Sequence, residues 1–471
     1  MNLLDALNPQ QREAVLATEG AVLILAGAGT GKTRVITYRI ANLIAQGVPG
    51  REILAVTFTN KAAEQMRDRL RILLESVGAD PHGPWISTFH SFCLRVLRRD
   101  APLLGLPRNF AIYDEDDQQS AIKLAIASLD IADPENTPRA LLSRISYAKN
   151  HGISPEEELA IAFDDRSKNA ARIFKAYEET LRKAGALDFD DLLLRAVELL
   201  RRFPDARASW QQRFRFLHVD EYQDTNRPQY DLLRLLSGAG ANLCVVGDED
   251  QSIYRWRGAD VGNILRFSED FPGARVLRIE QNYRSRQKIL DAAAAVVSQN
   301  SRRIGKQLEA TRGAGDNLVF YEARDARAES EYVAARVSQI SAAADSVAHV
   351  AVLYRTNAQS RSFEEAFRAR GMRYRLLGGF SFYQRAEVKD ALAYVRLAMF
   401  PHDDVAFLRV LNTPPRGIGK TTVEALRAVA RERGGISFWS ALGETVEAGG
   451  SRALAPLRSF RALIEDLQQK L

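Results

Sequence analysis

A glycine-rich run near the N-terminus carries residue types that bind phosphate. The run AGAGTGKT, residues 26–33, follows an apolar stretch and opens a helical pattern near Lys32. Its glycines let the backbone turn N–H groups toward phosphate oxygens, and the helix start adds the positive end of its dipole. The Lys32 ammonium can reach the β- and γ-phosphates, and the Thr33 hydroxyl can ligate Mg²⁺. The predicted phosphate loop consists of Ala26, Gly27, Ala28, Gly29, Thr30, Gly31, Lys32 and Thr33.

A pair of carboxylates ends another apolar run. In HVDEYQDTN, residues 218–226, Asp220 and Glu221 directly follow the apolar residues. Ligands bind outside the carboxyl ends of strands in open parallel sheets, so both side chains are expected beside the phosphate loop. Asp220 is predicted to hold Mg²⁺, directly or through water, and Glu221 to polarise an attacking water. The two motifs together predict an ATP site in which Lys32, Asp220 and Glu221 carry hydrolysis.

Short apolar runs are expected to form the strands that position these motifs. Each run is followed by a polar or glycine-rich turn and a helical pattern, which is typical of a parallel sheet covered on both faces. The runs are Ala21–Ala26, Ile53–Phe58, Phe216–Asp220, Leu243–Asp248 and Val276–Glu280. The predicted fold class is therefore α/β.

The rest of the chain predicts further units. Residues 95–200 are almost wholly helical in period, which indicates a helical insertion between strands of the first sheet. A second strand-bearing region is expected from about Gln281, with strands at Leu318–Ala323 and Val350–Arg355. After about Gly378 the pattern is again mostly helical. Breaks are expected at Pro401, Pro414–Pro415 and Gly434–Gly435.

Composition bounds the class of protein. A chain of 471 residues exceeds one core and predicts two to four domains of about 100–200 residues each. Its net charge of +6 tolerates a polyanionic partner. Cys93 and Cys244 lie in apolar runs and are predicted to be buried, reduced thiols. The N-terminus does not resemble a signal peptide, and the longest apolar run, Ala21–Ala28, is too short for a membrane span, so we expect a cytoplasmic protein without a membrane partner.

A series of motifs in a fixed order is more specific than any one of them. The series comprises LNPQQ (7–11), AGAGTGKT (26–33), TFTNKAA (57–63), STFHSF (87–92), LDFDDLL (187–193), VDEYQDTN (219–226), VVGDEDQSIYRWRGA (245–259), NYRS (282–285) and YRTNAQSR (354–361). With these motifs the chain resembles a superfamily 1A DNA helicase of the UvrD/PcrA/Rep type over essentially its whole length.

The resemblance implies RecA-like P-loop motor domains, built on parallel sheets, with two mainly helical insertion domains. The implied division is a first motor domain at 1–94 and 190–280, a helical insertion at 95–189, a partial second motor domain at 281–378, and a truncated helical accessory domain at 379–471. It further implies an ATP-dependent 3′–5′ DNA helicase or translocase that uses ATP and Mg²⁺. Such a protein is an ATPase stimulated by single-stranded DNA and acts in repair or replication. Its expected partners are single-stranded DNA, junctions of single- and double-stranded DNA, and repair proteins.

The resemblance also assigns roles at the nucleotide. Gln11 matches the adenine-reading glutamine, although Asn8 and Gln11 also fit a helix cap and capping box. Arg34 matches an arginine near the nucleotide, and Gln251 matches the residue that links the γ-phosphate to DNA. In NYRS, Tyr283 matches a base-stacking aromatic residue. Arg284 matches an arginine that contacts the γ-phosphate and stabilises transition-state charge.

The predicted DNA contacts combine rings and cations. The run Tyr254-Arg255-Trp256-Arg257 interleaves both types, which suits single strands because bases stack on rings while guanidinium groups meet phosphates. Trp256 matches the family's stacking tryptophan. The remaining residues matched to DNA-contacting segments are Phe58, Thr59, Asn60, Thr88, Phe89, His90, Arg355, Asn357 and Gln359.

Two further patterns have a purely structural interpretation as well as a functional one. RGIGKTT, residues 416–422, contains GKT but lacks a preceding buried strand, so it is predicted to be a turn between helices, either facing a DNA phosphate or without function. Asp188, Asp190 and Asp191 could ligate a metal, but their apolar neighbours favour a helix start with acids near its N-terminus.

Family members return to the second motor domain beyond the accessory domain, and we find no such return here, so the chain is expected to be a fragment.

Three rival functions stay open on the sequence. They are an ATP- and DNA-binding module without unwinding, a small-molecule kinase with the same loop, and a helicase–nuclease subunit.

Overall fold

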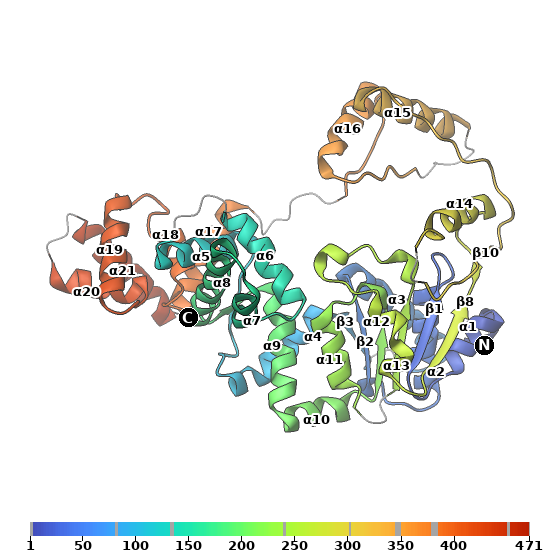
Figure 1. Ribbon diagram of the computed structural model, residues 1–471, viewed down its shortest axis with the longest axis horizontal. Coiled ribbons are helices and arrows are strands. Elements are labelled where there is room, and N and C mark those ends of the chain that lie inside the picture. Colours follow the sequence, from blue (N-terminus) through green and yellow to red (C-terminus); the bar gives the residue numbers. More distant parts are fainter. Residues whose placement is uncertain are drawn as a thin grey trace. The chain divides into compact units, whose positions relative to one another are not determined.

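The computed structural model describes residues 3–80, 83–131, 136–238, 242–300, 303–343, 350–377, 385–449 and 453–470 (Figure 1). The chain divides into two compact units. The first unit comprises Met1–Gly315 and Asp390–Leu471, and the second comprises Asp316–Lys389. None of the described helices is both long enough and apolar enough to cross a membrane.

A six-stranded parallel sheet is the centre of the first unit. Its strand order is β3-β2-β6-β7-β1-β8. The strands are β1 (Val22–Ala26), β2 (Ile53–Thr57), β3 (Trp85–Thr88), β6 (Phe216–Val219), β7 (Asn242–Gly247) and β8 (Arg275–Ile279). The five runs predicted as strands are confirmed. β3 was not predicted, because this four-residue edge strand includes Ser87 and Thr88 and alternates in burial instead of forming a continuous apolar run.

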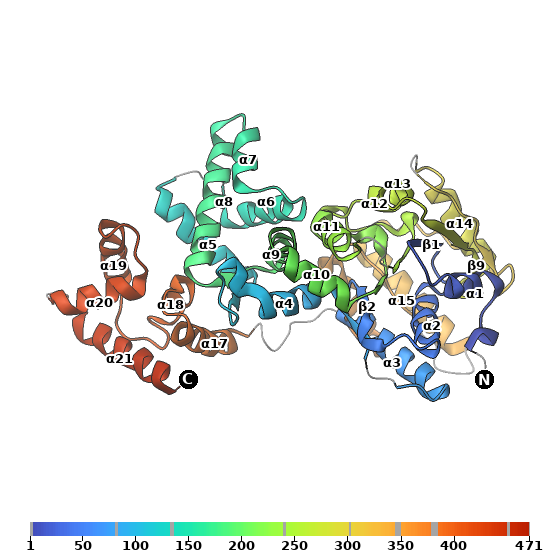
Figure 2. The ribbon, with the colours of Figure 1, turned by 90° about the horizontal axis from the view of Figure 1, so that it is seen from below.

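Two layers of helices cover the sheet, one on each face. Alternate residues of β1 point to opposite faces, so Leu23 and Leu25 join one core cluster while Val22 and Ile24 join the other. The first cluster is completed by α4 (Phe89–Asp100), α9 (Phe189–Arg202), α10 (Pro204–Arg213), α11 (Arg227–Leu236), α12 (Gly262–Leu265) and α13 (Phe267–Asp270). The second is completed by α1 (Pro9–Leu16), α2 (Lys32–Ala45) and α3 (Asn60–Ser76) (Figures 1 and 2).

A mainly helical segment lies between α4 and α9, as the helical pattern of residues 95–200 predicted, but the two ends of that range belong to α4 and α9, which cover the sheet. It contains α5 (Glu115–Leu129), α6 (Pro138–Asn150), α7 (Pro155–Ile161), α8 (Asp165–Lys183) and the short paired strands β4 (Ala111–Ile112) and β5 (Ala186–Leu187). Tyr113, Ile122, Ile145, Phe174 and Tyr177 belong to its own core.

The C-terminal part is helical, as predicted. It contains α17 (Ala386–Met399), α18 (Asp404–Val410), α19 (Lys420–Glu432), α20 (Phe438–Ala448) and α21 (Leu454–Lys470). The helices break at the predicted prolines and glycines. Leu397, Phe407, Leu426, Leu457 and Phe460 form the centre of a separate core.

Two predicted strands are wrong. Leu318–Ala323 and the described residues of Val350–Arg355 are irregular, and side chains such as Phe320 and Leu353 are exposed. A strand requires a neighbour to pair its backbone N–H and C=O groups, and the second unit contains no strand among its described residues. Its described elements are α15 (Ala326–Ala343), the 3₁₀ turn η7 (Asn357–Gln359) and α16 (Ser360–Ala369).

Short elements complete the described chain. Between β8 and the second unit lie β9 (Gln281–Asn282), α14 (Gln287–Val297) and β10 (Glu309–Ala310), with β9 and β10 paired in parallel. The 3₁₀ turns of the first unit are η1 (Leu3–Ala6), η2 (Gly50–Glu52), η3 (Ala101–Leu104), η4 (Tyr222–Asp224), η5 (Glu249–Gln251) and η6 (Arg255–Arg257).

Candidate nucleotide site and nucleic-acid groove

The glycine-rich loop connects β1 directly to α2. Its backbone is left-handed at Gly29 (φ 73°) and Gly31 (φ 93°), a conformation that residues other than glycine rarely adopt. Space also restricts Gly29, because an added Cβ would lie 2.6 Å from the Cβ of Arg284. The buried Thr30 hydroxyl donates to the Gly27 carbonyl at 2.8 Å and closes the turn. Local geometry thus explains both glycines, and α2 begins at Lys32 as predicted.

The acidic motif lies at the carboxyl end of β6, next to the loop. The Asp220 N–H donates to the Val56 carbonyl at 3.1 Å, which continues the pairing with β2. The Thr33 hydroxyl donates to Asp220 Oδ2 at 3.2 Å. A hydroxyl and a carboxylate are oxygen ligands of the kind that Mg²⁺ takes, so the pair fits the predicted metal role. Burial, reinforced by the Glu221 charge, raises the pKa of Asp220 to about 6.

Glu221 turns its carboxylate onto the lysine of the loop. Its backbone is left-handed, with φ 53°, which is uncommon for a residue other than glycine. Glu221 Oε2 accepts from the Lys32 ammonium at 2.8 Å and from the Gln223 amide at 2.8 Å. The structure therefore brings the three predicted catalytic residues Lys32, Asp220 and Glu221 to one place.

The segment after β7 carries the predicted Gln251. The Gln251 amide donates to the Asp248 carboxylate. The buried Lys306 ammonium in turn contacts Asp248 at 2.6 Å, Glu249 at 3.1 Å and Asp250 at 2.8 Å. Lys306 was not predicted, because it belongs to no motif and lies more than fifty positions away in the sequence. It fixes the segment that holds Gln251.

The NYRS residues approach the same loop. Asn282 donates from its amide to the Ala28 carbonyl at 2.5 Å, and the Tyr283 N–H donates to the Gly29 carbonyl at 2.9 Å. The Tyr283 hydroxyl accepts from the Asn8 amide at 2.8 Å, and its ring is 45% exposed. The structure thus places Tyr283 beside the start of α1 and brings the Cβ of Arg284 close to Gly29. Their contacts with a nucleotide stay predictions.

Gln11 occupies the capping position that the sequence indicated as an alternative role. Its Oε1 accepts from the Asn8 N–H at 3.3 Å, completing a capping box, and its Nε2 donates to the Thr30 carbonyl at 2.9 Å. Gln11 therefore joins α1 to the phosphate loop. Arg34 is exposed, donates to the Ala6 carbonyl at 2.7 Å, and stays a prediction as a nucleotide contact.

Three predicted DNA-contacting segments line one groove of about 680 Å³. We call it the aromatic groove, and its lining includes Phe58, Thr59, Asn60, Thr88, Phe89, His90, Trp256 and Arg257. The predicted Tyr254 supports the lining, because its ring stacks on Phe58 with centroids 6.0 Å apart. Trp256 is 66% exposed, and the Arg257 guanidinium lies 4.8 Å from its ring centroid. Rings and a cation are therefore available together on one surface.

The aromatic groove also contains a ring that was not predicted to act there. Phe189 stacks on His90 with centroids 3.9 Å apart and is 52% exposed. Its motif LDFDDLL was noted, but Phe189 was interpreted only as part of a helix start. Burial and the nearby Arg257 charge lower the pKa of His90 to about 4, so this imidazole is neutral near pH 7 and presents a ring instead of a cation.

Arg355, Asn357 and Gln359 belong to the second unit. All three are exposed, and the Gln359 side chain accepts from the Thr356 N–H at 2.9 Å in a capping box. A DNA contact by these residues stays a prediction.

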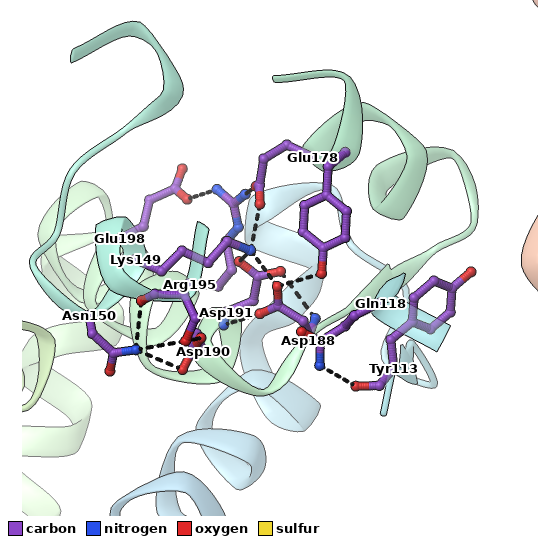
Figure 3. Close-up of polar contacts among 12 residues, drawn as sticks. Tyr113, Gln118, Lys149, Asn150, Glu178, Asp188, Asp190, Asp191, Arg195 and Glu198 are labelled. Carbon is purple, nitrogen blue, oxygen red and sulfur yellow. Dashed lines mark hydrogen bonds and ion pairs between the residues drawn. The ribbon is translucent and has the colours of Figure 1, made fainter. Parts of the chain in front are cut away.

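The interpretation of Asp188, Asp190 and Asp191 as the start of a helix is confirmed. Asp188 caps α9 and forms a capping box with Asp191. Oxygens of Glu178, Asp188 and Asp191 come within 4.8 Å of one another, as in a metal site. However, the Lys149 ammonium lies 2.5 Å from Glu178, 2.6 Å from Asp188 and 2.8 Å from Asp191 (Figure 3). A lysine thus supplies the positive charge that a metal would bring.

The remaining motifs also have simple positions. RGIGKTT connects α18 to α19 as a turn between helices, as predicted, and a phosphate contact there stays a prediction. Cys93 and Cys244 are both free and buried, which confirms their interpretation as reduced core thiols.

Comparison with known families decides the classification. Residues 7–272 match the UvrD/REP helicase N-terminal domain, and residues 277–444 match the UvrD-like helicase C-terminal domain. The chain belongs to the UvrD/REP helicase family. The observed α/β fold with its phosphate loop agrees with the RecA-like motor domains of this family.

Relatives in this family carry helicase names. The ATP-dependent DNA helicase PcrA of Bacillus subtilis is 45% identical over 468 residues, which cover 99% of this chain and 63% of that protein. The protein of the same name from Staphylococcus epidermidis is 44% identical, with 99% and 64% covered. That of Leuconostoc citreum is 42% identical, with 99% and 63% covered. The chain thus spans slightly less than two thirds of the length of these relatives.

Proposed function

We propose that this chain binds ATP and Mg²⁺ at the phosphate loop and uses hydrolysis to move along single-stranded DNA held in the aromatic groove. One observation carries the proposal. The Lys32–Glu221 and Thr33–Asp220 contacts lie at the carboxyl edge of the sheet, and Phe58, Thr59 and Thr88 follow or end neighbouring strands at that same edge. The names of the relatives support the same activity.

In the proposed site, Lys32 binds the β- and γ-phosphates, and Thr33 and Asp220 hold the metal. Mg²⁺ bound there supplies charge neutralisation for the transferred phosphoryl group. Glu221 orients the attacking water once Lys32 has exchanged its carboxylate for phosphate. Gln11 and Tyr283 contact the adenine base, and Gln251 and Arg284 contact the γ-phosphate.

The finer parts of the function are proposals on the strength of the family. They are 3′–5′ movement, unwinding at junctions of single- and double-stranded DNA, and a role in DNA repair or replication beside repair proteins. The division into 1–94 with 190–280, 95–189, 281–378 and 379–471 is also proposed, and the sheet and the separate helical cores support its first, second and last parts.

The test is phosphate release with ATP and Mg²⁺, with and without an oligo-dT strand. We expect turnover stimulated by the strand. Lys32→Ala should lower turnover by about 10²–10³-fold, because it removes a charge aimed at the transferred group. Lys123→Ala, an exposed lysine on α5, is the matched control.

The outcomes separate the candidate functions. Turnover that survives Lys32→Ala would contradict the assigned site. Binding of ATP and DNA without turnover would instead support a binding module that does not unwind. Turnover that an oligonucleotide does not change, but a small phosphate acceptor does, would favour a kinase.

A further inference from the structure

Asn150 ends helix α6 and touches three other segments of the first unit. Its Nδ2 donates to the Ser146 carbonyl at 2.8 Å and to Asp190 Oδ1 at 3.2 Å. Its Oδ1 accepts from the Asn226 amide at 2.6 Å. A Cβ added at Gly258 would lie 2.9 Å from the Cβ of Asn150, so the backbone there is in close contact with this side chain. Both the oxygen and the nitrogen of the Asn150 side-chain amide thus form hydrogen bonds.

Asn226 connects this contact to the acidic motif. It caps α11 through its Oδ1, which accepts from the Gln229 N–H at 3.0 Å, and it is buried. It lies five residues after Glu221, and η4 fills the sequence between them. Glu221 is the residue that pairs with Lys32. One short, buried segment therefore connects Asn226 to the residue that contacts the phosphate loop.

Gly258 connects Asn150 to the DNA-binding turn. Gly258 directly follows the 3₁₀ turn η6, which carries Trp256 and Arg257. Asn150, Asp190 and Asn226 also line the aromatic groove beside these two side chains. A single strand stacked on Trp256 would therefore lie beside both the turn and the end of α6.

The end of α6 is held by the preceding residue, Lys149. Its fully buried ammonium joins Glu178 of α8 to Asp188 and Asp191 at the start of α9 (Figure 3). Tyr177 also donates to Asp188 at 2.8 Å. Although burial acts to lower the pKa of Lys149, these carboxylates raise it well above its usual value. A permanently charged anchor therefore fixes the position from which Asn150 reaches outward.

We propose that Asn150 is a positioning residue that couples occupation of the aromatic groove to the nucleotide site, through its hydrogen bond to Asn226 and its contact with Gly258. The inference rests on the proposed function and adds a helical-insertion residue to it. A strand in the groove shifts the Gly258 turn against Asn150, and Asn226 carries the shift toward Glu221. The coupling is reciprocal, so bound nucleotide changes the affinity for DNA by the same factor.

The test measures the coupling without requiring turnover. The dissociation constant of a fluorescent, non-hydrolysable ATP analogue with Mg²⁺ is determined with and without saturating oligo-dT, for the full chain and its variants. We expect a ratio of about tenfold for the unaltered chain, within the range of about 5- to 150-fold that is typical of coupled sites. Asn150→Ala should bring the ratio close to one, whatever its effect on the affinity for oligo-dT alone.

A second variant and a control separate coupling from loss of fold. Asn226→Ser keeps a side chain able to cap α11 but removes the amide that donates to Asn150. It should lower the ratio as Asn150→Ala does, and the double variant should be no worse than either single one. Ser143→Ala alters the same helix and the lining of the same groove, at a hydroxyl that donates to the Arg139 carbonyl and lies outside the proposed route, and should keep the full ratio.

Each other outcome overturns the inference in a distinct way. Asn150→Ala with an unchanged ratio, or with only weaker oligo-dT binding, would make Asn150 an ordinary groove residue. Additive losses in the double variant would exclude the bond between Asn150 and Asn226 as the route. Unaltered chain that binds both ligands independently would refute the coupling but leave the proposed binding intact. Chain that binds neither ligand would refute the proposed function and this inference with it.

Discussion

Asp220 is the residue at which function and stability conflict most directly. It is buried at the end of β6 beside a second carboxylate, and burial is the larger cause of its raised pKa of about 6. The folded chain therefore binds this proton more tightly than the unfolded chain, whose aspartate has its ordinary pKa near 3.8. Ionised Asp220 suits a bound cation but destabilises the fold without one.

Asp220→Asn should therefore stabilise the chain at alkaline pH. Below about pH 4 the group is protonated in both states and the substitution changes little. Between pH 4 and 6 the unaltered fold loses stability because the unfolded chain releases the Asp220 proton while the buried carboxyl group keeps it, so above pH 6 the variant should be more stable by roughly 1–3 kcal/mol. Urea unfolding at pH 4 and pH 8, without metal or nucleotide, measures the difference. Asp68→Asn on the exposed face of α3 gives the baseline, and a variant less stable at pH 8 would contradict the argument.

The stacking surface also depends on a single residue. Trp256 is mostly exposed, so Trp256→Ala should leave the melting temperature nearly unchanged. Its loss should weaken binding of oligo-dT by about 10- to 100-fold, because a base stacked on an aromatic ring contributes about 1–3 kcal/mol. Fluorescence anisotropy at fixed salt measures the affinity. Phe163→Ala removes a comparably exposed ring outside the aromatic groove and should have no effect.

At the scale of elements, one buried ion cluster holds α6, α8 and α9 together. The Lys149 ammonium is surrounded by Glu178, Asp188 and Asp191, and Arg195 contacts Glu178 at 2.7 Å. Burial and the neighbouring Asp191 raise the pKa of Asp188 to about 7 despite the nearby lysine. The helices are therefore packed around charges that must balance one another.

Removing the cation from this cluster should be costly. Lys149→Met leaves three carboxylates buried together without their shared partner, and should lower the free energy of unfolding by about 3–5 kcal/mol. Lys175→Met is the matched control, because Lys175 pairs with Glu156 on the surface of the same helical insertion. Denaturant unfolding at pH 8 compares them. Equal small effects for both variants would show that the cluster does not hold the helices together.

At the scale of the whole molecule, a net charge of +6 is modest for the proposed binding of a polyanion. In the aromatic groove Arg257 lies beside the exposed Trp256, although Glu115, Asp190 and Asp224 also line it. Charge and stacking should therefore contribute separately measurable parts of the affinity for a single strand.

Salt dependence should separate these two contributions. Arg257→Gln should reduce the slope of log affinity against log salt concentration by about one, because one phosphate contact and its released counterion are lost. Trp256→Ala should weaken binding at every salt concentration without changing the slope. Oligo-dT titrations between low and moderate salt measure both. Equal slopes for Arg257→Gln and the unaltered chain would show that Arg257 does not meet a phosphate.

The sequence by itself determined the residues of the candidate nucleotide site and most of the sheet. The phosphate loop, Asp220, Glu221 and five strands could be predicted because each depends on neighbouring residues, on local spacing or on a continuous apolar run. The resemblance to the family added the aromatic residues, and the structure gathers those of the first unit into one groove.

Only the tertiary structure decided which distant residues meet. Four features join residues that no local pattern connects. They are the strand order, the contact of Lys306 with the Gln251 segment, the stacking of Phe189 on His90, and the ion pairs of Lys149 with the carboxylates. The apolar run Leu318–Ala323 fails as a strand for the same reason. Periodicity reports what a segment can do, whereas pairing, burial and charge balance depend on which partner lies beside it.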